Sequence, residues 1–111
     1  MKILSILSMC LSMLIGMDVY SQKTKTDTIK VWGNCDHCKK TIESSLDVRG
    51  VKKAEWNKDT QKLVVTYDTT KVDLDKISRL VGEAGYDNEK VKGNEKAYAN
   101  LPKCCQYNRK E

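Results

Sequence analysis

The sequence predicts a small α+β domain in which a four-stranded antiparallel sheet carries two helices on one face. Between residues 27 and 92, the periodic segments follow the order strand, helix, strand, strand, helix, strand, which is a split βαβ arrangement. Gly50 and Gly85 each follow a helical segment, where glycine commonly ends a helix. Right-handed crossovers would bring both helices onto the same face of the sheet, so that one core closes between the two layers.

The first strand and the first helix flank a short break at Gly33 and Asn34. Residues 27–32 alternate between apolar and polar side chains, as in a half-buried strand. Residues 36–47 are expected to be helical, because apolar side chains recur at four-residue spacing along one stripe. The stripe consists of Cys38, Ile42 and Leu46.

The central part of the chain predicts a β-hairpin followed by the second helix. Residues 51–57 and 62–67 are expected to be strands joined by a loop at 58–60, and the second strand is rich in β-branched side chains. Asp73 suits the N-cap of the next helix. The apolar residues that follow the helical period in this helix are Leu74, Ile77, Leu80, Val81 and Ala84.

Residues 86–92 are expected to form the fourth strand. The segment is poor in apolar side chains, which suits a strand at the edge of a sheet. With this strand, the element order is that of a ferredoxin-like βαββαβ sandwich, and the domain would span residues 22–93. Residues 94–111 are then expected to be a polar C-terminal tail that carries an adjacent cysteine pair, Cys104 and Cys105.

Residues 1–21 are expected to be a signal peptide. Lys2 gives the chain a basic start, and residues 3–17 are apolar apart from Ser and Gly. This run is shorter than the about 20 apolar residues that a membrane-spanning helix needs. Val19 and Ser21 supply the small residues that precede a cleavage site. We therefore expect export to a periplasm or the cell exterior; an uncleaved anchor is the alternative, and lipid attachment at Cys10 is disfavoured.

The charge balance argues against a nucleic-acid partner. The chain has 111 residues, with 20 Lys and Arg against 15 Asp and Glu, and a formal net charge of +5. This length holds one small domain and excludes a multi-domain enzyme. Because the basic residues are interleaved with acidic ones, the sequence lacks the basic run that would suggest a nucleic-acid interface.

Four cysteines remain once the predicted signal peptide is removed: Cys35, Cys38, Cys104 and Cys105. An even number in an exported chain usually indicates disulfides. Here the spacing argues against structural disulfides, because a bridge between Cys35 and Cys38 restricts the unfolded chain little. A bridge between adjacent cysteines would form a strained ring. Structural disulfides would therefore require one pair to bridge to the other.

Cys35 and Cys38 predict a site for a soft metal ion at the end of the first strand. Cys35 falls in the loop and Cys38 in the first helical turn, so both sulfur atoms can converge on one ion at roughly 2.1–2.3 Å. The helix N-terminus favours the thiolate over the thiol, and Lys39 and Lys40 would add to this effect. Two thiolates match Cu(I) or Hg(II) better than Zn(II), and they leave room for a partner's thiolate to remove the ion.

Residues 27–92 resemble the heavy-metal-associated domain family in two motifs. The Cys-x-x-Cys motif follows the first strand, and Gly85-Tyr86 follows the second helix. The family includes soluble copper chaperones, metal-pumping ATPases and a periplasmic mercury-binding protein. The resemblance implies that Cys35 and Cys38 are the metal ligands and that Tyr86 lies beside the ion.

The resemblance is incomplete around the first cysteine. Trp32, Gly33 and Asn34 stand where the family usually has Gly-Met-Thr, and the polar residues Asp36 and His37 separate the two cysteines. We still expect Asn34 and Lys39 to lie beside the two ligands. These departures leave the identity of the metal open.

Several of these residues also have a purely structural interpretation. His37 is either a metal ligand or a solvated residue at the start of the helix. Tyr86 is either a neighbour of the metal or an ordinary core aromatic. Trp32 and Trp56 are expected to be packing residues rather than metal contacts.

The cysteine pair of the tail supports two interpretations. In the first, Cys104 and Cys105 lie in an exposed tail, oxidised to a bridge or capped by another thiol. In the second, the tail folds back so that one or both cysteines complete the coordination of the ion, with Tyr98 and Leu101 docking it on the domain.

The sequence therefore predicts an exported metal-binding protein rather than an enzyme. Cu(I) is the favoured ion, with Hg(II) or Zn(II) as alternatives, and the protein would buffer or deliver it by exchange between thiolates. The resemblance implies a metal-transporting ATPase or an exported copper protein as partner, and two copies could share an ion as a homodimer. The competing predictions are a periplasmic Hg(II) scavenger and a thiol-disulfide oxidoreductase that uses the same cysteine pair.

Overall fold

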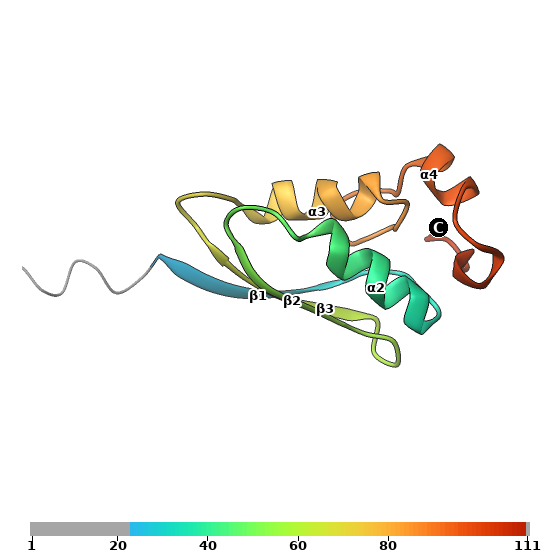
Figure 1. The fold of residues 1–111 in the computed structure, drawn as a ribbon, viewed down its shortest axis with the longest axis horizontal. Coiled ribbons are helices and arrows are strands. Elements are labelled where there is room, and N and C mark those ends of the chain that lie inside the picture. The colour runs from blue at the N-terminus through green and yellow to red at the C-terminus, as the bar shows by residue number, and fades with distance from the viewer. Residues whose placement is uncertain (1–22, 111) are drawn as a thin grey trace, which may run out of the picture.

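Two helices lie on one face of a three-stranded antiparallel sheet in the computed structural model, which describes residues 23–110 (Figure 1). The predicted signal peptide, residues 1–21, lies outside the described residues. The elements are β1 (Thr24–Lys30), α2 (Asp36–Ser45), β2 (Val51–Asn57), β3 (Lys62–Asp68), α3 (Leu74–Glu83), α4 (Glu95–Ala99) and a 3-10 turn, η2 (Lys103–Cys105). Within residues 23–110, no helix combines the length and apolarity needed to cross a membrane.

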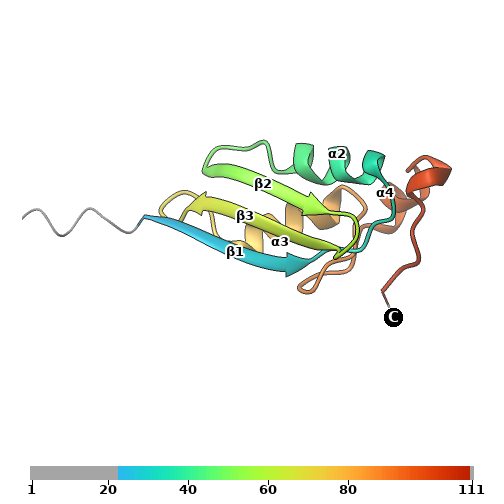
Figure 2. The same ribbon diagram turned by 90° about the horizontal axis from the view of Figure 1, so that it is seen from below.

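The sheet has the order β1-β3-β2, so the hairpin strand β3 lies in the centre (Figure 2). Leu63 of β3 pairs with Ile29 of β1 on one side and with Trp56 of β2 on the other. All three side chains are buried under the helices. The α+β class and the placement of both helices on one face are therefore confirmed.

The predicted fourth strand is not formed. Residues 86–92 lie beside the end of β1 but join it by an isolated bridge between Val31 and Asn88. Asn88 then turns the chain, because its backbone N–H donates to the carbonyl of Val91 at 2.9 Å and its side-chain Oδ1 accepts from the N–H of Lys90 at 3.2 Å. An Asx-type turn of this kind competes with strand geometry. The segment occupies the expected edge without extending the sheet.

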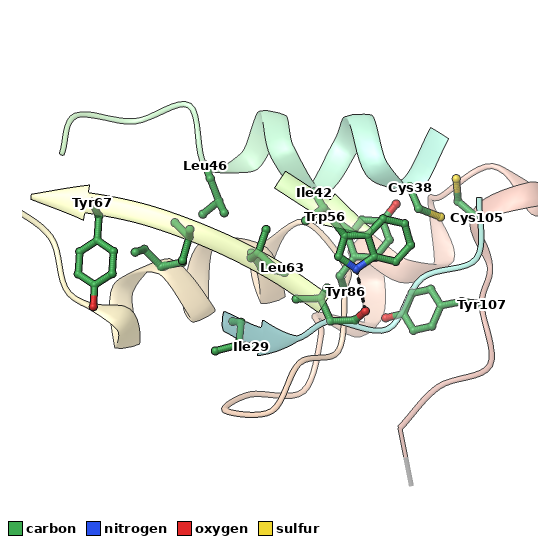
Figure 3. Packing of buried hydrophobic residues seen from close by; sticks show 14 of the residues in the cluster. Ile29, Cys38, Ile42, Leu46, Trp56, Leu63, Tyr67, Tyr86, Cys105 and Tyr107 are labelled. Carbon is green, nitrogen blue, oxygen red and sulfur yellow. Dashed lines mark hydrogen bonds between the residues drawn. The ribbon is translucent and has the colours of Figure 1, made fainter. Parts of the chain in front are cut away.

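Trp56 occupies the end of the core nearest to the loop after β1. Its ring is fully buried, and its Nε1–H donates to the carbonyl of Val31 at 3.0 Å (Figure 3). The ring lies so close to Gly33 that a Cβ at that position would be 2.8 Å from it. Gly33 is therefore needed for close packing, and the loop that follows it is held against the core. Trp32 is partly buried and packs against the same core.

The tail contains regular structure, although its polar composition predicts none. Asn94 caps α4, and its side chain accepts from the backbone N–H of Ala97 at 2.9 Å. A Cβ on Gly85, which has a φ of 103°, would be only 2.9 Å from the backbone nitrogen of Tyr98. The chain then passes through η2 and returns to the end of the domain where α2 begins (Figure 1).

Candidate metal centre

Three cysteine side chains meet at the N-terminal end of α2. The Sγ atom of Cys35 lies 3.4 Å from the Sγ atom of Cys38 and 3.4 Å from that of Cys105. All three sulfur atoms lie within 4.8 Å of one another. Cys38 and Cys105 are fully buried, and Cys35 is partly exposed, so the cluster has one side open to solvent.

The position of Cys35 and Cys38 follows from the transition between strand and helix. Cys35 is the N-cap of α2 with an extended backbone (φ −153°, ψ 173°), and Cys38 lies in the first turn. The inward stripe of α2 puts Cys38 above the core, where Cys38 and Ile42 are buried. The Cys38 thiol donates to Asn34 Oδ1 at 3.1 Å, so Asn34 lies beside this thiol.

Cys105 reaches the cluster because Tyr107 anchors the tail two residues later. The Tyr107 hydroxyl accepts from the N–H of Asp87 and donates to the carbonyl of Gly85, each at 2.7 Å. Its ring stacks on Tyr86 with 5.5 Å between centroids and meets the ring of Tyr98 edge-on at 5.1 Å. Figure 3 shows Tyr107 and Cys105 beside Tyr86 and Cys38.

A buried charge pair provides a second anchor for the tail. Asp87 is fully buried, and its Oδ1 accepts from Arg109 Nη2 at 2.7 Å and from the N–H of Gly93 at 2.6 Å. Its Oδ2 accepts from Arg109 Nε at 3.1 Å and from the N–H of Lys110 at 2.8 Å. Burial alone would raise the pKa of Asp87, but these hydrogen bonds to the carboxylate hold its pKa below the usual range.

Tyr86 lies under the cysteine cluster with its hydroxyl group unpaired. The residue is fully buried, and its Oη is the one buried side-chain nitrogen or oxygen atom without a hydrogen-bond partner among the described residues. Figure 3 shows it next to Cys38. Burial, followed by the neighbouring thiols of Cys38 and Cys105, raises the pKa of Tyr86, so this phenol is a neutral donor at neutral pH.

The thiols of Cys35 and Cys105 differ in acidity. Burial opposes ionisation of Cys35, but hydrogen bonds from the backbone N–H of Cys38 and from the Cys105 thiol outweigh it and lower the pKa of Cys35 to about 7. Burial, together with its place as donor to the other two sulfurs, raises the pKa of Cys105. Cys35 therefore ionises more readily than Cys105, and its thiolate is the reactive, nucleophilic form.

Three of the predicted site residues lie outside the group formed by Cys35, Cys38 and Cys105. The Lys39 ammonium instead donates to Glu43 Oε2 at 2.6 Å and to the carbonyl of Trp56 at 3.0 Å, since its long side chain turns toward β2. His37 points into solvent from the first turn of α2. Cys104 is exposed, 3.9 Å from the sulfur of Cys105, and does not belong to the group of three.

Most of the residues that dock the tail are not marked by any pattern in the sequence. Tyr98 and Leu101 were expected to dock the tail, and both pack against the core, whereas Tyr107, Asp87 and Arg109 were not expected there. Asp87 was assigned to an edge strand, where a charged side chain is ordinary. The start of the tail does carry a pattern that predicts a helix, since Asn94 precedes a short run of helix-forming residues and Asn is a favoured N-cap.

Comparisons with known proteins agree with this fold. The profile of the "Heavy-metal-associated domain" family matches residues 34–87. The copper chaperone CopZ of Staphylococcus epidermidis is 39% identical over 61 residues, which cover 53% of this chain and 90% of CopZ. The mercuric transport protein periplasmic component of an Alcaligenes species is 35% identical over 65 residues, covering 57% of this chain and 71% of that protein.

A solved structure shares the fold of the domain. Oxidized MerP from Ralstonia metallidurans CH34 superposes with a TM-score of 0.56 and 32% identity, covering 60% of this chain and 94% of MerP. Cys105 and the anchors that follow it lie beyond the span that the family profile matches, which ends at residue 87.

Proposed function

Because the chain belongs to the heavy-metal-associated domain family, we propose that it binds a soft metal ion through Cys35 and Cys38 and transfers it by thiolate exchange. The observation that carries this proposal is the 3.4 Å separation of the two sulfur atoms at the start of α2. Both are held by the same loop and first turn, so an ion can bridge them with little rearrangement. The protein acts by binding and release rather than by catalysis.

Cu(I) is the ion that we propose first. A low coordination number and soft sulfur ligands suit Cu(I), whereas a structural Zn(II) site usually takes four ligands. The similarity to a copper chaperone supports this choice. Hg(II) is the second candidate, supported by the similarity to the mercuric transport protein and by the same preference for sulfur.

Export and the delivery partner complete the proposal. Residues 1–21 have the composition of a signal peptide, so the protein would work in a periplasm or outside the cell. The partner would be a metal-transporting ATPase or an exported copper protein that offers its own thiolates. The partly exposed Cys35 supports this route, because an incoming thiolate can reach the ion from that side.

A thiol-disulfide oxidoreductase is the competing function, and one observation favours it. Cys35 is partly exposed and has a pKa lowered to about 7, as an attacking thiolate requires. Catalysed reduction of insulin disulfides by the reduced protein would support this alternative. We expect no such catalysis, because Cys35 would act as a metal ligand.

An anaerobic titration tests the proposal directly. The reduced protein is titrated with Cu(I) against a chromophoric chelator, beside Cys35→Ser, Cys38→Ser and, as the control, Cys104→Ser. We expect one Cu(I) per chain, a loss of at least tenfold in affinity for each of the first two variants, and no change for the control. Failure of the unmodified protein to compete for Cu(I), and for Hg(II) in a parallel titration, would overturn the proposal.

A further inference from the structure

We propose that Cys105 is the third sulfur ligand of the ion, so that the C-terminal tail of this same chain closes the metal site. The inference rests on the proposed function, since it adds a ligand to the pair already described. The ligand chemistry is that of a soft d10 ion in a trigonal three-sulfur site, which Cu(I) and Hg(II) share.

The distances between the sulfur atoms fit a three-coordinate ion. An ion bound to three sulfurs at about 2.3 Å would hold the sulfurs about 4 Å apart. Cys35 lies 3.4 Å from both other sulfurs, and all three atoms are within 4.8 Å of one another. Small rotations of the side chains are therefore enough to form the site. Binding would transfer the thiol protons to the buffer, with no change of oxidation state of sulfur or metal.

The unpaired hydroxyl of Tyr86 is a second observation that indicates an anionic cluster above it. Its oxygen atom is buried without a hydrogen-bond partner among the described residues, which costs free energy. A thiolate sulfur of a bound ion would accept the hydrogen bond that the present thiols leave unmade. Figure 3 shows Tyr86 and Cys38 side by side, so the donor already lies where it is needed.

The anchors on both sides of Cys105 hold it at the cluster. Upstream, α4 packs against Gly85, and downstream, Tyr107 and Arg109 bind the carbonyl of Gly85 and the carboxylate of Asp87. These contacts attach the tail to the domain on both sides of Cys105. Because Cys105 lies between these contacts and is fully buried, its position is determined by the fold of the tail.

A third ligand from the same chain is expected to change how firmly the ion is retained and how it is transferred. In a two-sulfur site, the third position is free for a thiolate of a partner or of a second copy. Here Cys105 fills that position, so we expect the loaded protein to be a monomer that retains the ion more firmly. Transfer then requires that a partner's thiolate displaces Cys105, while Cys35 remains accessible.

The experiment compares Cys105→Ser with Cys104→Ser, which changes the adjacent but exposed thiol. Each reduced protein is loaded with Cu(I) and separately with Hg(II), after any thiol reductant is removed. X-ray absorption at the metal edge reports the number of sulfur neighbours, competition with a chelator reports affinity, and native mass spectrometry reports ions per chain. Near-UV circular dichroism checks that the core of each variant is folded, and Cys105→Ala repeats the measurement without a hydroxyl group.

We expect three sulfur neighbours in a monomer for the unmodified protein and for Cys104→Ser. Cys105→Ser and Cys105→Ala should each show two sulfur neighbours and at least tenfold weaker binding. A third sulfur that persists in both Cys105 variants, or two sulfurs in the unmodified protein, would overturn the inference and leave the two-cysteine proposal intact. Absence of binding by the unmodified protein would instead overturn the proposed function itself.

Discussion

The carboxylate of Asp87 and the guanidinium of Arg109, 22 residues apart in the chain, form a salt bridge with 2.7 Å between Oδ1 and Nη2. Asp87 is fully buried, while 18% of the Arg109 side chain is exposed. Asp87 belongs to the segment after α3, and Arg109 to the tail. The pair therefore links the docking of the tail to the ionisation of a carboxyl group inside the domain.

Replacement of Arg109 by Ala is expected to release the tail without unfolding the domain. Removing one partner of a fully buried ion pair costs about 3–5 kcal/mol. The cost here would be smaller, because release of the tail lets water reach Asp87. Labelling with iodoacetamide followed by mass spectrometry should show faster modification of Cys105 in the variant, with Lys103→Ala as the control in the same tail. Equal rates of Cys105 labelling in all proteins would contradict this prediction.

Acid is expected to weaken the docking of the tail. The pKa of Asp87 is lowered in the folded protein. Its carboxylate therefore stabilises the fold at any pH above the pKa of an Asp in the unfolded chain, about 3.9. This stabilisation is lost as the pH falls through the lowered pKa of the folded protein. Near-UV circular dichroism of the tyrosines should therefore change at low pH. Asp87→Asn should lack this transition and be less stable at neutral pH; an identical acid transition in the variant would assign it to another group.

Alkylation of Cys35 in the metal-free protein is expected to have a midpoint near pH 7. The pKa of Cys35 is lowered from 9.0 to about 7, so its thiolate accumulates about two pH units earlier than that of an ordinary cysteine. Cys105→Ala should shift the midpoint upward, because it removes the thiol whose hydrogen bond to the Cys35 sulfur stabilises the thiolate. Rates measured at residue level by mass spectrometry distinguish Cys35 from Cys104. A midpoint near 9 would show that the surroundings do not favour the thiolate.

Tyr86→Phe is expected to separate stability from metal binding. The variant removes a buried hydroxyl group that has no partner, so urea unfolding of the metal-free protein should show unchanged or higher stability. The bound thiolates would lose a donor, and affinity for Cu(I) should fall several-fold. Unchanged affinity in the chelator competition would show that Tyr86 serves only to pack the core.

The parts of the fold that depend on local periodicity were predictable from the sequence. The hairpin strands, the Asp73 cap and the inward stripe of α2 each follow from spacing within a few residues. The Cys-x-x-Cys loop was predicted for the same reason. Its two sulfur atoms lie within one turn of chain, and no distant contact is needed to bring them together.

The parts that depend on distant contacts were not predictable. Asn88 converts the expected edge strand into a turn, and the neighbouring Asp87 is bound by the tail. The sequence allowed either Cys104 or Cys105, or both, to reach the ion. Docking by Tyr107, two residues after Cys105, turns that cysteine inward and leaves its neighbour in solvent. Which of the two adjacent cysteines points inward depends on this tertiary contact, and the local sequence pattern does not predict it.

The order of the three cysteines along the chain determines the order in which their thiols become available during synthesis. Cys35 and Cys38 belong to the first strand-helix unit, whereas Cys105 follows 70 residues after Cys35 and is synthesised last. A nascent chain therefore completes its two-sulfur loop before the third sulfur exists. A chain cut short after residue 93 would keep the sheet, both helices and the first two thiols, yet carry no means of closing over them. If Cys105 is the third ligand, we expect such a truncated chain to release its ion more readily than the full chain.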